Sequence, residues 1–538
     1  MRITRPRPLL SAALAGTLVF GALAGCSAVA ATETTTTTTT ESTETDTSTG
    51  TTTTAVALDV TEALADNKDY TETAALADET WDASDEVAIT LEGDTASASG
   101  DGVTVDGSTV TITAPGTYRI SGTLTDGQIV VSSAVEGVVR LVLDGADITS
   151  STTSAIAVME ADKVSVVLAD GTQNSLEDAS TYEYADGEDE PNAALFSAAD
   201  LVISGGGSLD VTGSSNDGIA SEDELVIAGG TITVTAVDDG VRGKDYLVVT
   251  GGTLDVTAQG DGLKSDNEDG TDDDGDTVGY IAFLGGDVTV SSGDDGVHAE
   301  SDLVIGDGTL TVTEAVEGLE GAHILVAGGT VDVTASDDGL NAAGATSTTT
   351  DDTTAENAAA TAPEPPAGGP GGGGGGTGGE AAGDFSLAIT GGTLTVDAGG
   401  DGLDSNGTFT ITGGDITVFG PTSDGNGALD SQGTFTVDGG TVIAVGSAGM
   451  AQSPGASSAQ GWVAATFDTL SAGTVLQVTD ADGTVVAEVT LTKDTRSVVL
   501  SGAEVQDGAT YTVVADGSEV ATATAGEAVA GGMGGMRP

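Results

Sequence analysis

The stretch that decides the fold runs from residue 229 to residue 263, GGTITVTAVDDGVRGKDYLVVTGGTLDVTAQGDGL, and it contains one phrase twice. A Gly pair is followed by alternating apolar residues, then by an Asp-Gly dipeptide and an aliphatic residue. The alternation predicts β-strands in which Ile232 and Val234 face a core while Thr231, Thr233 and Thr235 face solvent. A phrase that returns at this distance is typical of a chain that stacks one structural unit on the next.

The acid that precedes Gly in each phrase, here called the marker acid, recurs along the chain. The marker acids are Asp217, Asp239, Asp261, Asp295, Glu317, Asp338 and Asp401. Their spacings are 22, 22, 34, 22, 21 and 63 residues, so the two long spacings equal one repeat plus an insertion. The sequence therefore predicts an all-β fold, a right-handed parallel β-helix built as a solenoid of ~22-residue rungs. A β-sandwich is the alternative, but sandwich strands do not repeat one phrase at constant spacing.

The rest of the chain divides around this body by composition. Residues 1–25 are basic and then apolar and end in Leu-Ala-Gly before Cys26, which predicts a signal peptide and a lipidated cysteine; ordinary cleavage with an idle thiol is the alternative. The other segments are a Thr-rich disordered stalk at 26–54, the parallel β-helix at 85–450 with a Gly- and Pro-rich disordered insertion at about 345–384, a small C-terminal β module at 456–525, and a disordered tail at 526–538.

The charge balance restricts the partners. The formal net charge is −72, with 85 acidic residues against 13 basic ones, so nucleic acid is not an expected partner. A single cysteine excludes disulfides within the chain. The apolar part of the predicted signal peptide is too short to cross a bilayer comfortably. We therefore expect an exported protein on the extracellular face of the cell membrane, held there by its lipid alone.

A marker acid in every repeat predicts a ladder of carboxylates about 4.8 Å apart. Two unit charges at that distance repel by roughly 1 kcal/mol in water, and by more at a protein surface. Because Lys and Arg are so few, we expect bound Ca²⁺ to neutralise the ladder, with the seven marker acids as its ligands. The alternative is that Asp and Gly merely form the turns, with the carboxylates solvated or capping backbone amides.

The position two residues after each marker Gly changes from repeat to repeat. It is occupied in turn by Ala220, Arg242, Lys264, His298, Glu320, Asn341 and Asp404. Arg242, Lys244, Lys264 and His298 form a small basic cluster that could bind a uronate carboxylate, with Tyr246 as the nearest aromatic residue. Simple compensation of the neighbouring Asp charges is the alternative. Aromatic residues make up only 3% of the chain, so an aromatic platform for neutral glycans is not expected.

Several phrases resemble a family of bacterial carbohydrate-binding proteins with a β-helix close to that of pectate lyases. These phrases are Glu190–Ser197 (EPNAALFS), Asp239–Tyr246 (DGVRGKDY), Asp261–Asn267 (DGLKSDN), Asp295–Ala299 (DGVHA), Gly427–Gly433 (GALDSQG) and Gly449–Pro454 (GMAQSP). The resemblance covers about residues 85–520. It implies a calcium-containing lipoprotein at the cell surface that binds plant-type polysaccharide, including acidic pectic chains and cellulose. The stalk, the glycine insertion and the acidic loop near Asp272 lie outside the shared pattern.

Three functions follow from these observations. The first is a non-catalytic protein that binds acidic polysaccharide through Ca²⁺ and the basic cluster. The second is a polysaccharide lyase in which Lys264 or Lys244 removes a proton, which requires a lowered lysine pKa; many neighbouring carboxylates should raise it instead. The third is a calcium-stabilised structural or adhesive surface protein that uses its outward Thr rows. We favour the first function.

Overall fold

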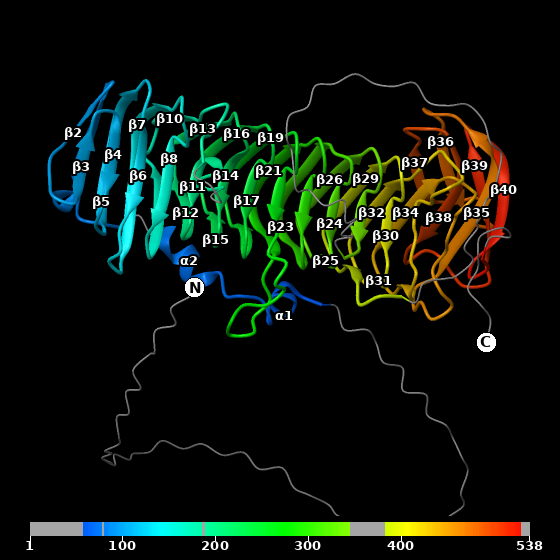
Figure 1. Cartoon of the computed structure of the whole chain (residues 1–538). Helices are drawn as coiled ribbons and strands as arrows, with labels where there is room; N and C mark the ends of the chain where they lie inside the picture. The colour runs from blue at the N-terminus through cyan, green and yellow to red at the C-terminus, as the bar shows by residue number, and fades with distance from the viewer. Residues whose placement is uncertain (1–57, 78–79, 185–188, 345–381, 529–538) are drawn as a thin grey trace, which may run out of the picture. The chain divides into compact units, whose positions relative to one another are not determined.

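The computed structural model describes residues 58–77, 80–184, 189–344 and 382–528. Within these residues nearly all regular structure is β-strand, and the repeats follow one another in chain order from β5 to β34 (Figure 1). The short helical segments are α1 (Val60–Ala63), α2 (Thr71–Ala74), η1 (Ala75–Ala77) and η2 (Ala83–Asp85). Contacts between distant parts of the chain dominate, because each strand pairs with the strand one repeat away.

One sheet carries the strand that follows each marker acid. It has 12 strands: β3 (Val103–Asp106), β4 (Thr109–Ile112), β6 (Gln128–Ser132), β8 (Ile156–Glu160), β11 (Ala193–Ser197), β14 (Asp217–Ser221), β17 (Val241–Gly243), β20 (Leu263–Ser265), β22 (Val297–Ala299), β24 (Leu319–Gly321), β27 (Leu340–Ala342) and β30 (Leu403–Ser405). From β4 to β30 the pairing is parallel, and aliphatic residues such as Val241, Leu263 and Val297 point inward without exposed surface.

A second sheet of 24 strands supplies two further rows of each repeat. The first row, here called the strap-side row, contains β9 (Lys163–Leu168), β12 (Asp200–Gly205), β15 (Glu224–Ile227), β18 (Tyr246–Val249), β25 (His323–Val326), β28 (Ser386–Ile389), β31 (Thr408–Ile411) and β33 (Phe435–Val437). The second, the threonine row, contains β10 (Gln173–Glu177), β13 (Ser208–Gly213), β16 (Thr231–Ala236), β19 (Thr253–Thr257), β26 (Thr330–Ala335), β29 (Thr393–Ala398), β32 (Asp415–Phe419) and β34 (Thr441–Gly446).

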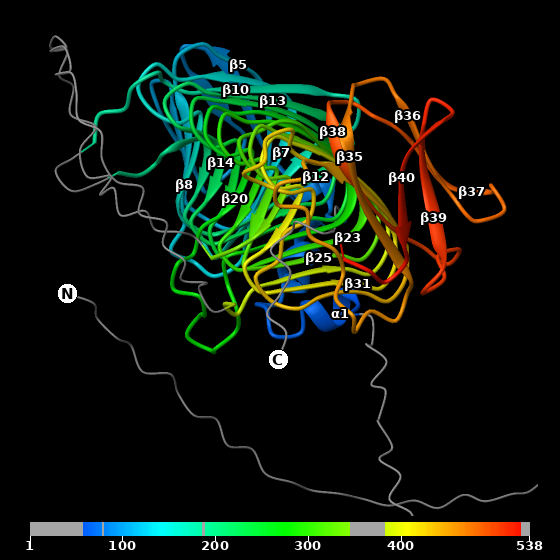
Figure 2. The ribbon, with the colours of Figure 1, turned by 90° about the vertical axis from the view of Figure 1, so that its right-hand side faces the viewer.

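Long strands join these two rows into one sheet. β21 (Tyr280–Ser291) and β23 (Asp302–Glu314) run through the corner and pair with both rows, and β7 (Val138–Thr149) does the same earlier in the chain. The sheet also includes β1 (Val87–Gly93), β2 (Ala96–Ala98), β5 (Gly116–Leu124), β35 (Trp462–Leu470) and β38 (Thr495–Ser501). Viewed along the stack, the strands of both sheets surround a common interior (Figure 2). One cluster of buried Val, Ile and Leu side chains fills that interior from Ile89 to Val499.

The strands of the C-terminal part are not a detached module. β38 pairs antiparallel with both β34 and β35, so the large sheet continues into residues 462–501. The remaining strands form a four-stranded antiparallel sheet: β36 (Val475–Thr479), β37 (Val485–Thr490), β39 (Thr510–Ala515) and β40 (Ser518–Thr524). A second apolar cluster, which includes Phe419 and Val445 of the repeats, lies beneath this sheet.

These pairings correct the fold class predicted from the sequence. The described residues form an all-β fold of three sheets with 24, 12 and 4 strands, in which parallel rows end in antiparallel pairs such as β1–β2, β3–β4 and β34–β38. The prediction of a right-handed parallel β-helix solenoid with a small separate C-terminal module is therefore not retained. The prediction failed because the repeated phrase identifies single strands and does not show how they are joined. The sheets are joined by strands that continue through a corner and by the antiparallel strands at the ends.

The inward and outward positions within a strand are as the sequence predicts. Ile232 and Val234 are buried, while Thr231, Thr233 and Thr235 are exposed. The predicted stalk at 26–54 lies outside the described residues, as does most of the predicted insertion at 345–384 and of the predicted tail at 526–538.

The Gly of each marker dipeptide allows close stacking of successive repeats. A Cβ at Gly262 would overlap the Val290 side chain and lie 2.6 Å from the Gly296 carbonyl oxygen, and Gly240 and Gly318 are confined in the same way. The backbone φ angles at these three positions are not in the left-handed region. The requirement for Gly is therefore one of space between repeats.

We predict that Gly262→Ala destabilises the protein by about 1–3 kcal/mol, because the added methyl group must displace the next repeat. Thermal unfolding followed by circular dichroism measures the effect. Gly425→Ala is the control, since a Cβ there meets no atom within 4 Å. Equal melting temperatures for the two variants would contradict the stacking requirement.

Candidate functional site

The residues two positions after each marker Gly form one row on the outer face of the 12-stranded sheet. The strand register pairs Arg242 with Lys264, Lys264 with His298, and His298 with Glu320. Further pairs extend this row to Asn341 and Asp404. The predicted column is therefore a physical feature of the surface, with a basic half and an acidic half.

The marker acids form a second row beside this one, and they cap the backbone of the next repeat. One carboxylate oxygen of Asp239 accepts a hydrogen bond from the Asp261 amide at 2.9 Å, and Asp261 accepts from the Asp295 amide at 3.0 Å. The same bond joins Asp217 to Asp239 and Asp338 to Asp401. One of the two oxygen atoms in each of these carboxylates thus caps a backbone amide. Capping of backbone amides was the alternative to calcium binding in the sequence analysis.

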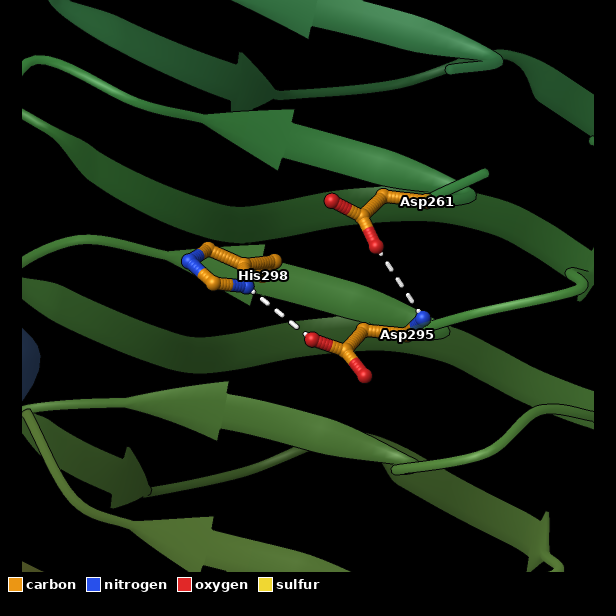
Figure 3. A group of neighbouring side chains, drawn as sticks. All are labelled: Asp261, Asp295 and His298. Atoms are coloured by element: carbon orange, nitrogen blue, oxygen red, sulfur yellow. Dashed lines mark hydrogen bonds and ion pairs between the residues drawn. The ribbon is translucent and has the colours of Figure 1, made fainter. Parts of the chain in front are cut away.

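The other oxygen of the first marker acids is held by a basic side chain. Asp217 pairs with Arg242 Nε at 3.1 Å, while Lys264 Nζ lies 3.1 Å from Asp239 and 2.9 Å from Asp261. His298 Nδ1 lies 3.0 Å from Asp295 (Figure 3). Arg242, Lys264 and His298 thus neutralise this half of the ladder.

Arg242 and His298 each bind more than one carboxylate. The guanidinium of Arg242, whose side chain is 8% exposed, also contacts Glu222 at 2.7 Å and Asp266 at 3.6 Å. Burial works against a charged His298, but hydrogen bonds to Asp295 and Glu320 outweigh it and raise the imidazole pKa to about 11. His298 is therefore a cation at neutral pH. The contacts of Arg242, Lys264 and His298 are those expected for charge compensation.

The second half of the ladder has no such compensation. Burial, reinforced by neighbouring carboxylates, raises the pKa of Asp338 to about 6, those of Glu317 and Asp401 to about 7, and that of Asp404 to about 8. Among the described residues, no Lys, Arg or His lies within ion-pair distance of these four carboxylates. Asp430 of the next turn adds to the charge beside Asp404.

A hard cation fits this half of the surface. Asp295, Glu317 and Glu320 offer oxygen atoms that lie within 4.8 Å of one another, and Ca²⁺ binds oxygen at 2.3–2.6 Å. Asn341 donates to Glu317 at 2.9 Å, while its own Oδ1 is buried and accepts no hydrogen bond. Of these three acids, Asp295 and Glu320 already share His298, whereas Glu317 has no cationic partner among the described residues. The Glu317 carboxylate and the unused Asn341 amide oxygen are donors of the kind that Ca²⁺ prefers. Asp261, Asp295 and His298 also lie together, but there the imidazolium already supplies the positive charge.

A polar cavity of about 360 Å³ lies at the basic end of the row. Its lining includes Asp189, Glu190 and Asn192 from the segment before β11, and Asp217, Arg242 and Lys244 from the repeats. Among the described residues, the ion-pair partner of Lys244 is Glu222, at 3.3 Å, and the Lys244 side chain is 42% exposed. It is the basic residue of this group that is most accessible to a ligand.

An exposed aromatic ring stands beside this cavity. Tyr184 is 43% exposed, stacks obliquely on Tyr182 with 5.8 Å between ring centroids, and donates its hydroxyl to the Pro191 carbonyl. Pro191 lies between Glu190 and Asn192, which line the cavity, so this bond holds the Tyr184 hydroxyl near the rim of the cavity. The sequence analysis missed this tyrosine. Its position just before the EPNAALFS phrase was the signal that could have identified it.

Tyr246, by contrast, does not belong to this surface. It lies in β18 of the strap-side row, is fully buried, and donates its hydroxyl to Glu224. Side chains alternate across a strand and the two sheets differ, so nearness in sequence to Arg242 did not bring it near the cavity. Tyr246 is covered by the N-terminal segment and is inaccessible to a glycan.

Cys26 lies outside the described residues. Among residues 58–528, apart from the gaps given above, no helix has the length and apolarity that a membrane crossing requires.

Comparison with known proteins identifies relatives of part of the chain. Residues 106–361 match the sequence model of the family described as carbohydrate-binding domain-containing protein, which confirms the resemblance predicted from the sequence over that range. A protein of that description from Acetivibrio thermocellus is 45% identical over 137 residues, which are 25% of this chain and 48% of the relative. The chain thus spans about half the length of this curated relative.

One solved structure is also similar, that of a polysaccharide lyase-like protein from C. thermocellum in a gadolinium derivative. It is 36% identical and covers 42% of this chain and 91% of its own, with a TM-score of 0.41. At that TM-score we draw nothing further from the likeness.

The raised carboxyl pKa values predict how stability depends on pH. Between about pH 4 and pH 8 the folded protein binds more protons than the unfolded chain, so without divalent cations stability falls as pH rises through this window. We predict that Asp404→Asn raises the melting temperature at pH 8 by roughly 1–4 °C and has little effect at pH 4. Asp255→Asn, which removes an exposed carboxylate of the threonine row, is the control. A shift at pH 8 no larger than that of the control would contradict the analysis.

Proposed function

We propose that this protein is a non-catalytic binder of polysaccharide, since residues 106–361 match the sequence model of the family described as carbohydrate-binding domain-containing protein. The observation that carries the proposal is the cavity beside Tyr184. Sugar rings have apolar C–H faces and hydroxyl groups that both donate and accept hydrogen bonds. An exposed aromatic ring next to carboxylates, amides and a lysine offers a partner for each of these groups.

We propose that the bound glycan is acidic and that Ca²⁺, more than the basic cluster, holds its carboxylates. Arg242, Lys264 and His298 are each engaged by two or more protein carboxylates, so they have little capacity left for a uronate. The surrounding charge is strongly negative and would repel an acidic chain. A divalent cation at the acidic half of the row would offset that repulsion and would bind the uronate carboxylate directly.

In this proposal Glu317, Glu320, Asp338, Asp401 and Asp404 supply the oxygen ligands of calcium. The first marker acids, Asp217, Asp239 and Asp261, hold no free carboxylate oxygen, because each binds an amide and a basic side chain. When bound, the cation supplies positive charge and open coordination positions. The chain's own groups orient the glycan across the 12-stranded sheet.

The contacts of Lys264 favour binding over lyase chemistry. A lysine that removes a proton must be neutral for part of the time. Burial lowers the Lys264 pKa, but the charges of Asp261 and Asp239 outweigh burial and hold that pKa above its ordinary value. Lys264 is therefore a cation at neutral pH, and we assign it a structural role.

We also propose that the protein is exported and lipid-anchored through Cys26, as its N-terminal sequence indicates. Such an anchor would hold the binding surface at the extracellular face of the membrane.

The exposed threonines support a second candidate function. Along β16, β19 and β26 the outward positions are Thr or Asp in every repeat, and all of them are exposed. A regular polar face of this kind suits an adhesive role toward an extended partner. In that case calcium would serve only stability.

We predict that Tyr184→Ala lowers affinity for polygalacturonate about five- to tenfold in the presence of Ca²⁺, because packing of a sugar ring on an aromatic face is worth about 1–1.4 kcal/mol. Binding is measured as retention on insoluble polygalacturonate and on cellulose, each with Ca²⁺ and then with chelator. The comparison of the two materials measures the preference for an acidic over a neutral polysaccharide. Tyr184→Phe, which keeps the ring, is the control. Passage of the unmodified protein through both materials would refute the proposed function and direct attention to the threonine face.

A second experiment tests the calcium ligands alone. We predict that Asp401→Asn removes one Ca²⁺ site or weakens it at least about tenfold, since one negative ligand is lost. The Asn side chain can still accept from the Gly427 amide, so the turn is preserved. Calorimetric titration of chelator-treated protein measures the sites, with Asp255→Asn as the control. Identical titrations of Asp401→Asn and Asp255→Asn would remove Asp401 from the ligand set.

A further inference from the structure

The N-terminal segment Leu58–Ala77 lies as a strap across the outer face of the strap-side row. Its apolar side chains cover an outward-facing cluster in the sheet. The strap contributes Leu58, Val60, Ala63, Leu64, Tyr70, Ala74, Leu76 and Ala77, and the sheet contributes Val202, Val226, Tyr246, Val248, Tyr280, Ala282, Val304 and Leu325. Isolated helices as short as α1 and α2 are unstable in water, so the strap is ordered by these contacts.

Lys68 fastens the strap at its centre. Its Nζ lies 2.5 Å from Asp245, 3.1 Å from Glu224 and 3.2 Å from Asp223. Glu224 is 8% exposed and also accepts hydrogen bonds from Thr73 of the strap and from Tyr246. Without the ammonium group, three clustered carboxylates would stand unneutralised under an apolar cover.

The insertion between β20 and β21 forms backbone hydrogen bonds with the strap. The Thr277 amide donates to the Asp66 carbonyl at 2.8 Å, and the Lys68 amide donates to the Thr277 carbonyl at 2.9 Å. The Tyr280 hydroxyl donates to the Lys68 carbonyl at 2.7 Å, and the Gly279 amide donates to the Asp245 carbonyl at 2.6 Å. The insertion therefore depends on the strap for part of its own backbone pairing.

The same insertion begins at the glycan cavity. Asp266 lines that cavity and contacts Arg242 Nη1 at 3.6 Å, and Asn267 binds Asp245 through its side chain. Residues 266–279 thus run from the cavity on the 12-stranded sheet to the latch under the strap. Asp245 and Lys244 are adjacent residues of the turn between β17 and β18, so the cavity and the latch also share this turn.

We infer that the strap, the Lys68 latch and the insertion form one cooperative unit that couples the N-terminal segment to the cavity beside Tyr184. Opening this unit leaves the strand pairing and the main apolar core of the repeats intact, so it requires less free energy than unfolding of the repeats. When the strap leaves, Thr277 loses both of its backbone partners and Asp245 loses the Lys68 ammonium group. The insertion, which bonds to Asp245 through Asn267 and Gly279, is then held less firmly. The regulatory consequence rests on the proposed function, whereas the coupled opening does not.

Hydrogen exchange of the full chain tests the coupled opening. We expect Lys68→Met to increase amide exchange at least about tenfold in peptides covering 58–77 and also in peptides covering 266–279, with β16 and β19 unchanged. Lys68→Arg, which keeps the charge, should retain protection. Lys493→Met is the matched control, because Lys493 has the same 21% side-chain exposure and an ion pair with Asp397 at 2.6 Å.

Two outcomes of this experiment would overturn the inference. Unchanged exchange in 58–77 would show that Lys68 is no latch, and faster exchange confined to 58–77 would show that the insertion is not coupled to the strap. Thr277→Pro tests the link between insertion and strap from the insertion's side. Proline has no backbone N–H, so the hydrogen bond to the Asp66 carbonyl is lost. This variant should increase exchange in both segments.

Coupling free energies are reciprocal, so a ligand at the cavity should protect the strap. With saturating polygalacturonate and Ca²⁺, we expect slower exchange in 58–77, and weaker retention of Lys68→Met than of Lys493→Met. Equal retention of these two variants would overturn the coupling to the cavity. Failure of the unmodified protein to bind at all would instead refute the proposed function and leave the ligand-free exchange result as it stands.

Discussion

The bond between a marker carboxylate and the amide of the next marker acid is the interaction on which the rest of the structure depends. It recurs from Asp217 to Asp239 to Asp261 to Asp295 and satisfies a backbone donor at a turn that no strand pairs. The Gly beside it allows the turns to approach closely enough for the bond to form. The aliphatic residue that follows points into the core. Three adjacent residues thus provide a cap, a close approach and an anchor in the repeats from Asp217 to Asp295, and Asp338 caps Asp401 in the same way.

This solution creates an electrostatic problem, because it places a charge in every repeat at about 4.8 Å intervals. The first half of the row solves it with Arg242, Lys264 and His298, each set between two or more carboxylates. The second half keeps its carboxylates without cationic partners, and the pKa of Asp404 rises to about 8 as a result of burial and neighbouring charge. The two ends of the row therefore differ in charge. The carboxylates at the end near Tyr184 have cationic partners, whereas those at the other end have none among the described residues.

The sequence was sufficient for the features that a local pattern determines. The inward positions of Ile232 and Val234, the register of Arg242 with Lys264, and the division of the row into basic and acidic halves all follow from the constant repeat. It was insufficient for features that depend on the corner between strands. β21 continues through the corner between the two rows and so joins them into one sheet. The repeated phrase contains no signal that tells a continuous strand from two separate ones. The role expected for Tyr246 was wrong for a related reason, since that residue lies beyond such a corner.

Contacts over long sequence separation were equally beyond the sequence. Asn67 donates to Asp302 across 235 residues, and Lys68 meets Asp245 across 177, although nothing in the residues around Lys68 indicates a partner. These contacts give the acidic insertion a physical role that its composition alone does not suggest. An insertion rich in Asp would by itself be a solvated loop, yet Thr277 ties it to the strap, Gly279 ties it to Asp245 and Asp266 ties it to Arg242. The strap itself does not line the cavity, so its link to the cavity runs through the bonds of Thr277 to the strap and the place of Asp266 in the cavity lining.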